Sequence, residues 1–325
     1  MKKKLWIKIG IGVIVIAAVA LLFAGNYLVN FAIVRKDTAN NVAPESTVTA
    51  ENQAIIQANT EIIEKQKEDW LAKTEQEIAE IVSDDGLQLK GDVFWTNRDS
   101  HKWVIAIHGY TGQRTDMQSV ASFYGKNDFN VLTPDMRSHG ESEGTYIGMG
   151  WLDRKDVLKW IQYVLQLDSN AEIILHGISM GGATVMMVSG EELPPQVKGI
   201  VEDCGYTSVW DIFSDELDYL FRLPEFPILY AADVVASIRA GYEFKTASAI
   251  KQVEKSNVPI LFIHGSEDNF VHTDMVYPLY EACKTPKDIL VVEGAGHGNS
   301  YRMDPDLYFQ TVFEFIEREC FSNVY

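Results

Sequence analysis

Residues 172–190, EIILHGISMGGATVMMVSG, contain the stretch of sequence that decides the fold. The apolar run that ends at Leu175 predicts a buried strand, and residues 182–189 predict a helix. Between them, GISMG at residues 177–181 fits the pattern G-x-S-x-G, which is common by itself. In a strand–turn–helix setting, this pattern holds a serine on a tight turn with its hydroxyl exposed. The glycines suit that turn, because a Cβ atom there would clash. We therefore predict that Ser179 is a nucleophile.

The alternation of strand and helix continues on both sides of this stretch. Further apolar runs lie at residues 103–107, 130–133, 197–201, 258–263 and 289–292, and helical segments lie at 114–125, 151–167, 180–190, 272–283 and 305–320. A turn signal at residues 83–86 predicts an opening hairpin. Apolar strands separated by helices predict a mainly parallel sheet that is covered on both faces. Functional side chains are then expected at the carboxyl ends of the strands.

A nucleophilic serine needs a general base, and the base needs an acid that orients it. His297 lies in a glycine-rich loop directly after the last predicted strand. Asp268 lies in the loop that follows the preceding strand, and Glu267 and Asp203 are alternative orienting acids. The sequence therefore predicts Ser179, His297 and Asp268 as the candidate catalytic set.

The order of Ser179, Asp268 and His297 along the chain resembles that of the catalytic triad in the α/β-hydrolase superfamily. Three further segments resemble motifs of that superfamily. HGYTG at residues 108–112 resembles its oxyanion loop, and HGSED at residues 264–268 resembles its acid loop. DMRSHGES at residues 135–142 resembles its D-x-R-G-H-G-x-S loop, with Ser138 in place of the usual glycine. The resemblance covers roughly residues 77–325, and the chain is similar to bacterial serine-aminopeptidase-like and lysophospholipase-like hydrolases, which are often membrane-anchored. It implies the α/β-hydrolase fold, with a mainly parallel eight-stranded sheet, helices on both faces and a helical cap.

The resemblance also implies a role for each candidate residue. His297 accepts the proton of Ser179, and Asp268 fixes the tautomer of the imidazole. The backbone N–H groups of Met180 and Tyr110 are expected to bind the oxyanion that precedes the acyl-enzyme. This mechanism needs no metal ion and no organic cofactor, and the sequence contains no cysteine–histidine cluster with metal-ligand spacing.

Residues 205–250 separate two predicted core strands and resemble the cap insertion of the superfamily. Pro224 and Pro227 divide this segment into at least two helical pieces. Most of its aromatic side chains are expected to pack the cap onto the core. Tyr206, close to the end of a core strand, is the candidate substrate-binding residue.

The N-terminus reads MKKKLWIK, and residues 9–34 that follow it carry no charged side chain. This run is long enough to span a membrane and exceeds the apolar core of a cleaved secretory signal, which is the alternative. Four lysines precede it, so the positive-inside rule predicts a cytoplasmic N-terminus and an extracellular body at the cell membrane. The predicted organisation is a membrane anchor (1–36), a linker and stalk helix (37–76) and a hydrolase-like domain (77–325).

Charge and cysteine content narrow the range of functions. The chain carries 28 Lys and Arg against 46 Asp and Glu, a net charge of −18, and residues 37–325 alone carry −24. Such an acidic body repels the phosphates of nucleic acids, which argues against a DNA- or RNA-binding function. Cys204, Cys283 and Cys320 are too few for a disulfide framework, and we expect them to be buried and reduced.

Together these features predict a membrane-anchored extracellular serine hydrolase that cleaves carboxylic esters, such as short acyl esters or monoacyl lipids. A serine peptidase that releases N-terminal residues would use the same triad, but it needs an acidic group for the substrate ammonium. A thioesterase or acyltransferase would share the acyl-enzyme. The third alternative, a catalytically silent binding protein on the same fold, is disfavoured by the intact candidate triad.

Overall fold

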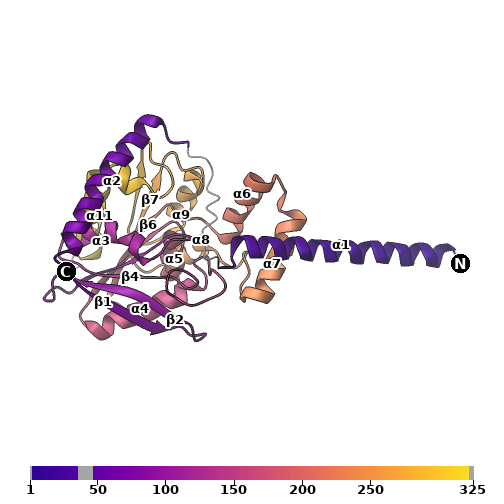
Figure 1. Cartoon of the computed structure of the whole chain (residues 1–325), viewed down its shortest axis with the longest axis horizontal. Helices are drawn as coiled ribbons and strands as arrows, with labels where there is room; N and C mark the ends of the chain where they lie inside the picture. The colour runs from indigo at the N-terminus through magenta and orange to yellow at the C-terminus, as the bar shows by residue number, and fades with distance from the viewer. Residues whose placement is uncertain (1, 36–46, 322–325) are drawn as a thin grey trace.

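The computed structural model describes residues 2–35 and 47–321, and one sheet of eight strands lies at its centre (Figure 1). The strands are β1 (Glu75–Val82), β2 (Gln88–Trp95), β3 (Lys102–Ile107), β4 (Asn130–Pro134), β5 (Glu172–Ile178), β6 (Val197–Asp203), β7 (Ile260–Gly265) and β8 (Lys287–Val292). Their spatial order is β1-β2-β4-β3-β5-β6-β7-β8. β1 and β2 form an antiparallel hairpin, β2 runs antiparallel to β4, and the other neighbours are parallel. The predicted mainly parallel sheet of eight strands is confirmed.

Helices cover both faces of this sheet. On one face lie α4 (Asp153–Leu167), α5 (Met180–Ser189), α8 (Ala249–Val253) and α9 (Val276–Ala282), and on the other lie α2 (Ala50–Leu71), α3 (Gln118–Gly125), α10 (Ser300–Met303) and α11 (Pro305–Phe315). Single turns at Arg114–Met117, Thr273–Met275 and Ile316–Cys320 adjoin α3, α9 and α11. Every residue of β4 and β7 is buried, because helices cover the sheet on both sides. This two-sided burial explains why the central strands have continuous apolar sequences.

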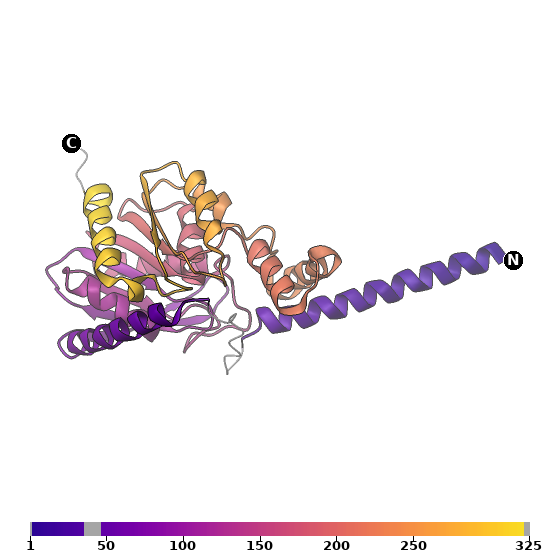
Figure 2. The same cartoon turned by 90° about the horizontal axis from the view of Figure 1, so that it is seen from above.

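Helix α2 lies along the body of the protein (Figure 2). Its apolar side chains Ile63 and Trp70 are buried in the same core as α3 and α11. Asn59 donates from Nδ2 to the backbone carbonyl of Arg302 at 2.8 Å, and Gln66 donates to Ser122 Oγ at 3.0 Å. Polar side chains on this face therefore bind α2 to the body as its apolar ones do.

Two helices between β6 and α8 form the cap, α6 (Val209–Phe221) and α7 (Glu225–Ala240). Ser208 caps α6 by accepting a hydrogen bond from the N–H of Asp211 at 3.0 Å. Pro224 precedes α7, and Gly241, with a φ of 77°, ends it in the left-handed region. The cap thus has the two helical pieces that the prolines predict.

Helix α1 (Lys2–Ala32) extends away from the body, and its C-terminal part packs against the cap (Figures 1 and 2). It is the one helix in residues 2–35 and 47–321 that is long and apolar enough to cross a membrane. Val29 and Ile33 belong to the same buried core as the cap, so the predicted anchor and the body share a packed interface. β1 begins at Glu75, before the boundary expected at residue 77, and most of the predicted linker lies outside the described residues.

Candidate active site

Ser179 lies on the turn between β5 and α5, and its backbone adopts a conformation that few side chains tolerate. Its φ is 59° and its ψ is −119°. A Cβ atom on Gly177 would lie 2.1 Å from the carbonyl oxygen of Gly181, and one on Gly181 would lie 2.1 Å from that of Ile107. The glycines of the G-x-S-x-G pattern are therefore required by backbone contacts, as the sequence analysis expects. The N–H of Ser179 donates to the carbonyl of Asp203 at 2.8 Å, which ties the turn to β6.

The structure brings Ser179, His297 and Asp268 into one line of hydrogen bonds. His297 Nε2 lies 2.8 Å from Ser179 Oγ, and His297 Nδ1 lies 2.7 Å from Asp268 Oδ2. Because an ionised carboxylate only accepts, Nδ1 carries the proton that binds Asp268, and Nε2 is left to accept from the serine hydroxyl. This tautomer is the one that a general base for Ser179 requires.

Two backbone N–H groups and two histidine rings contact Asp268, and the Nε2 of His264 also lies 2.9 Å from the carbonyl oxygen of Val271. The N–H groups of Phe270 and Val271 each donate to Oδ1 at 3.0 Å, while His297 and His264 meet Oδ2, His264 at 3.3 Å. Burial by itself would raise the pKa of this carboxyl, but the hydrogen bonds from both histidines outweigh it and lower the pKa to about 2. Asp268 is therefore an anion across the physiological range.

The alternative orienting acids have other contacts. Asp203 accepts hydrogen bonds from Ser300 Oγ at 3.0 Å and Tyr308 OH at 3.1 Å, and burial raises its pKa to about 6. Glu267, next to Asp268, lies only partly buried in the loop. The contact between His264 and Asp268 is a feature that the sequence analysis did not anticipate; its one signal was the place of both residues in the HGSED motif.

The two predicted oxyanion donors lie beside Ser179. Met180 is the first residue of α5, where backbone N–H groups have no partner within the helix. Tyr110 lies in the loop after β3, and its neighbour Gly109 is so close to the nucleophile that a Cβ atom there would lie 3.2 Å from Ser179 Cβ. The phenol of Tyr110 points away to α1 and donates to the carbonyl of Ala32 at 2.7 Å. Both backbone segments line the same cavity as Ser179.

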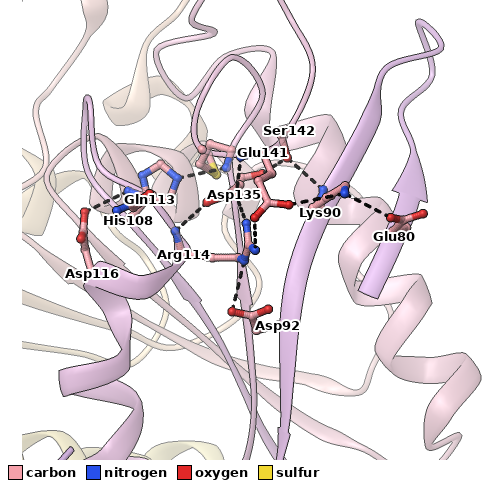
Figure 3. Close-up of polar contacts among 12 residues, drawn as sticks. Glu80, Lys90, Asp92, His108, Gln113, Arg114, Asp116, Asp135, Glu141 and Ser142 are labelled. Carbon is pink, nitrogen blue, oxygen red and sulfur yellow. Dashed lines mark hydrogen bonds and ion pairs between the residues drawn. The ribbon is translucent and has the colours of Figure 1, made fainter. Parts of the chain in front are cut away.

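An ionic cluster, largely buried except for Glu141, fixes the loop that carries Tyr110 (Figure 3). Arg114, which follows this loop, forms an ion pair with Asp135 and donates its backbone N–H to the same carboxylate at 2.7 Å. The guanidinium also lies 3.1 Å from Asp92 and 2.8 Å from Glu141. The motif at residues 135–142 therefore has a structural role, because it holds the loop after β3 in place against the sheet.

A cavity of about 480 Å³ opens from Ser179 and His297 into the cap. Its walls are mostly apolar and include Phe213, Leu217 and Phe221 of α6. Tyr206, the candidate substrate-binding residue, lies in this wall, and its hydroxyl donates to the carbonyl of Met149 at 3.1 Å. The size and apolar lining are typical of a site for a small organic ligand.

Two features of the cavity were not anticipated from the sequence. Leu28, Phe31 and Ala32 of α1 form part of its wall, although the sequence suggested only an anchoring role for this helix. The second feature is an acidic side chain in the cavity wall, Glu216 of α6. Burial, together with the nearby charge of Asp215, raises the pKa of this carboxyl to about 7. Neither feature has a local sequence signal, because each depends on which segments meet in space.

Cys204, Asp268 and His297 have potential ligand atoms within 4.8 Å of one another. Burial raises the pKa of the Cys204 thiol well above its ordinary value, which opposes the thiolate that a metal ion would bind. Asp268 and His297 already bind each other. This donor set therefore does not fit a metal ion. All three cysteines of the chain are buried free thiols, as predicted.

Comparisons with known proteins relate the chain to serine hydrolases and esterases. A family model described as serine aminopeptidase, S33, matches residues 98–212, and one described as serine hydrolase (FSH1) matches residues 184–298. The Bacillus subtilis protein YqkD is 27% identical over 67% of this chain and 72% of its own length, and a carboxylesterase of the same organism is 21% identical over 69% and 96%. The structure of the Pyrococcus furiosus esterase Pf2001, 24% identical, covers 76% of this chain and 94% of its own, with a TM-score of 0.62.

Each family model matches a different part of the body, and together they span the segments that carry Ser179, Asp268 and His297. The chain therefore has the α/β-hydrolase fold, and its similarity to serine hydrolases and to a carboxylesterase supports its assignment as a hydrolase.

Proposed function

We propose that the protein hydrolyses carboxylic esters through an acyl-enzyme on Ser179. The observation that carries this proposal is the line of hydrogen bonds from Asp268 through His297 to Ser179 at the wall of an apolar cavity. A hydroxyl in this position is activated by the adjacent base, and the cavity beside it offers an apolar environment for an acyl chain.

In the proposed reaction, Ser179 Oγ attacks the ester carbonyl while His297 Nε2 takes the hydroxyl proton. The oxyanion accepts hydrogen bonds from the N–H groups of Met180 and Tyr110, and Asp268 stabilises the imidazolium. The tetrahedral intermediate expels the alcohol, which takes the proton from His297. Water then attacks the acyl-enzyme, again with His297 as base, and releases the carboxylic acid.

We further propose that α1 is a retained membrane anchor with the body on the outer side. The buried contacts of its C-terminal part support retention: Val29 is 1% exposed, Asn26 Oδ1 accepts from Arg239 at 2.6 Å, and Ala32 accepts from Tyr110. Cleavage after the apolar run would remove these contacts. The lysines that precede the run support a cytoplasmic N-terminus. Intact-mass measurement of the membrane-extracted protein tests retention, and a mature chain that lacks α1 would contradict it.

The test of activity uses the full chain in a nanodisc, because α1 forms part of the cavity wall. Initial rates are measured with p-nitrophenyl esters of increasing acyl length, beside Ser179→Ala. We expect turnover with a chain-length optimum in the wild type and none in the variant. Met180→Leu is the matched control, since it keeps the backbone N–H, and its turnover should be near that of the wild type. Absence of turnover for every ester in a folded sample would contradict the proposal.

A second candidate is a peptidase that binds a free amino terminus, and one observation favours it. Glu216 is an acid in the cavity wall, where its anion would pair with a substrate ammonium. Rates with aminoacyl p-nitroanilides and with acyl esters, measured for the wild type and Glu216→Gln, separate the two candidates. A peptidase would lose aminoacyl turnover in the variant, whereas an esterase with an apolar acyl site would keep its ester turnover.

A further inference from the structure

The outer face of cap helix α7 is apolar. The exposed residues of this helix are Glu225, at its start, followed by Phe226, Tyr230, Val234 and Ile238. Tyr230, Val234 and Ile238 recur every fourth position of the helix and thus lie along one side. The backbone of Phe226 is not helical, but its ring packs edge-on against Tyr230, with ring centroids 5.6 Å apart, and extends the same side. These four residues are hereafter called the α7 stripe. Their exposed fractions are 72%, 42%, 52% and 78%. A continuous exposed apolar face of this kind is typical of a surface that contacts another protein or a membrane.

The position of α1 indicates what covers the α7 stripe. α1 crosses α7 at Gly25, where a Cβ atom would lie 2.6 Å from the backbone of Ala231. Trp6 and Tyr27, both largely exposed, are amphipathic aromatic residues near the two ends of the most apolar part of α1. They lie 21 positions apart along the helix, or about 32 Å at ~1.5 Å per residue, which matches the ~30 Å hydrocarbon core of a bilayer. Tryptophan and tyrosine side chains are enriched at the two membrane–water interfaces.

The crossing point therefore lies at the level of the outer interface, where Tyr27 ends the span. α7, which contacts α1 there, is held at the depth at which amphipathic helices rest on a bilayer. Lys245 is exposed beside the stripe, with its ammonium 3.6 Å from the ring of Tyr230. A cation at the edge of an apolar face suits lipid phosphates, toward which lysine side chains extend.

The same junction borders the candidate active site. Leu28 and Phe31, one turn beyond the crossing, line the cavity together with Leu229 of α7. Phe31 also packs edge-on against Phe221 of α6, with ring centroids 5.6 Å apart. Part of the cavity wall is thus built from residues that lie near the end of the span.

We propose that the α7 stripe rests on the bilayer beside α1, and that the cavity takes the acyl chain of a membrane-resident monoacyl ester directly from the lipid surface. The second half of this proposal rests on the proposed esterase function. The first half, the docking of α7, is independent of any chemistry. Two experiments with the full chain in phosphatidylcholine vesicles keep these halves apart.

The first experiment measures depth. A fluorophore attached to Ile238→Cys reports on the stripe, because the three native cysteines are buried, and Glu314→Cys on α11 is the matched exposed control. Lipids with a quencher on the acyl chain should quench the label at position 238 several-fold more than the label at 314. Equal, weak quenching at both positions would overturn the docking. A blue-shifted label at 238 without quenching would mean that a second copy of the chain covers the stripe, which also overturns it.

The second experiment measures turnover of a monoacylglycerol embedded in the vesicles and of water-soluble p-nitrophenyl acetate. In Val234→Glu/Ile238→Glu, turnover of the embedded ester should fall at least tenfold while that of the soluble ester stays unchanged. Ile55→Glu/Ile62→Glu, which places the same charges on exposed apolar positions of α2, should affect neither.

The outcomes of these two experiments are distinguishable. Unchanged turnover of the embedded ester in the α7 variant would overturn lipid delivery and leave the esterase proposal intact. If the wild type hydrolysed neither ester, the esterase function and the lipid-delivery proposal would both fail, and the depth measurement would still decide whether α7 docks.

Discussion

Replacing Asp268 with asparagine should lower kcat/KM for a p-nitrophenyl ester by about 10⁴-fold in a folded protein, because it reverses the tautomer of His297. The reversal follows from the contacts of the carboxylate. Oδ1 accepts two backbone N–H groups, from Phe270 and Val271, each at 3.0 Å. An asparagine must keep its carbonyl oxygen at that position, because an NH₂ group facing two N–H groups would leave every donor without an acceptor.

The NH₂ group of the asparagine then occupies the position of Oδ2, 2.7 Å from His297 Nδ1 in the native structure. Nδ1 accepts a hydrogen bond there only when the ring proton is on Nε2. In that tautomer His297 donates to Ser179 instead of accepting its proton, so the general base is lost. A 10⁴-fold decrease corresponds to about 5 kcal/mol of transition-state stabilisation.

The assay is the initial rate of ester hydrolysis by the full chain in nanodiscs, with near-UV circular dichroism to verify packing. Glu267→Gln is the matched control, because it removes the neighbouring carboxylate of the same loop, and its rate should stay within about twofold of wild type. More than a tenth of wild-type activity in folded Asp268→Asn would refute the reasoning. An equal loss of activity in the Glu267 variant would contradict the assignment of Asp268 as the orienting acid.

Three further predictions concern the cavity, the ionic cluster and the turn. Because the pKa of Glu216 is about 7, its side chain is mostly neutral at pH 6 and mostly anionic at pH 8, so KM for a long-chain ester should rise several-fold over this range. Glu216→Gln should make KM independent of pH over this range. An unchanged pH profile in the variant would count against Glu216 as the titrating group. Arg114→Met leaves buried carboxylates unpaired and should lower the free energy of unfolding by about 3 kcal/mol in chemical denaturation. Arg98→Met, which removes the exposed ion pairs with Glu75 and Glu77, should hardly change the free energy of unfolding, and equal effects of the two variants would contradict the reasoning. Gly177→Ala drives a methyl group into the backbone of Gly181, so the yield of folded protein should collapse, and a stable, active variant would show that the turn can relax.

The parts of the fold that follow local sequence rules were predictable. Strands β4 and β7 are buried on both faces, and such strands require continuous apolar runs. The turn at Ser179 needs glycines at fixed offsets, so its signal is confined to five residues. The candidate site followed from the same logic, because Asp268 and His297 lie in loops after the last two strands and parallel strands bring their carboxyl ends to one edge.

The contacts of the two N-terminal helices could not be predicted in this way. Asn59 and Gln66 occupy core-type positions in the apolar repeat of α2, which argues against a coiled coil and favours a helix that lies partly on the body, without indicating its partners. In the structure both donate hydrogen bonds to the body. The partners are distant in sequence, and a side-chain amide has no periodicity that would indicate a carbonyl more than 240 residues later.

The sequence by itself predicted the candidate chemistry of this protein from local features: a serine on a tight turn, a candidate base and acid in the order typical of a serine hydrolase, and an apolar N-terminal run. Only the tertiary structure decided where that chemistry takes place. It joined Leu28 and Phe31 of α1 to Phe221 of the cap in one cavity wall, and set the exposed face of α7 beside the end of the apolar helix. Motifs are local because the backbone geometry that they serve is local, whereas a cavity is made by side chains that meet only after the chain has packed.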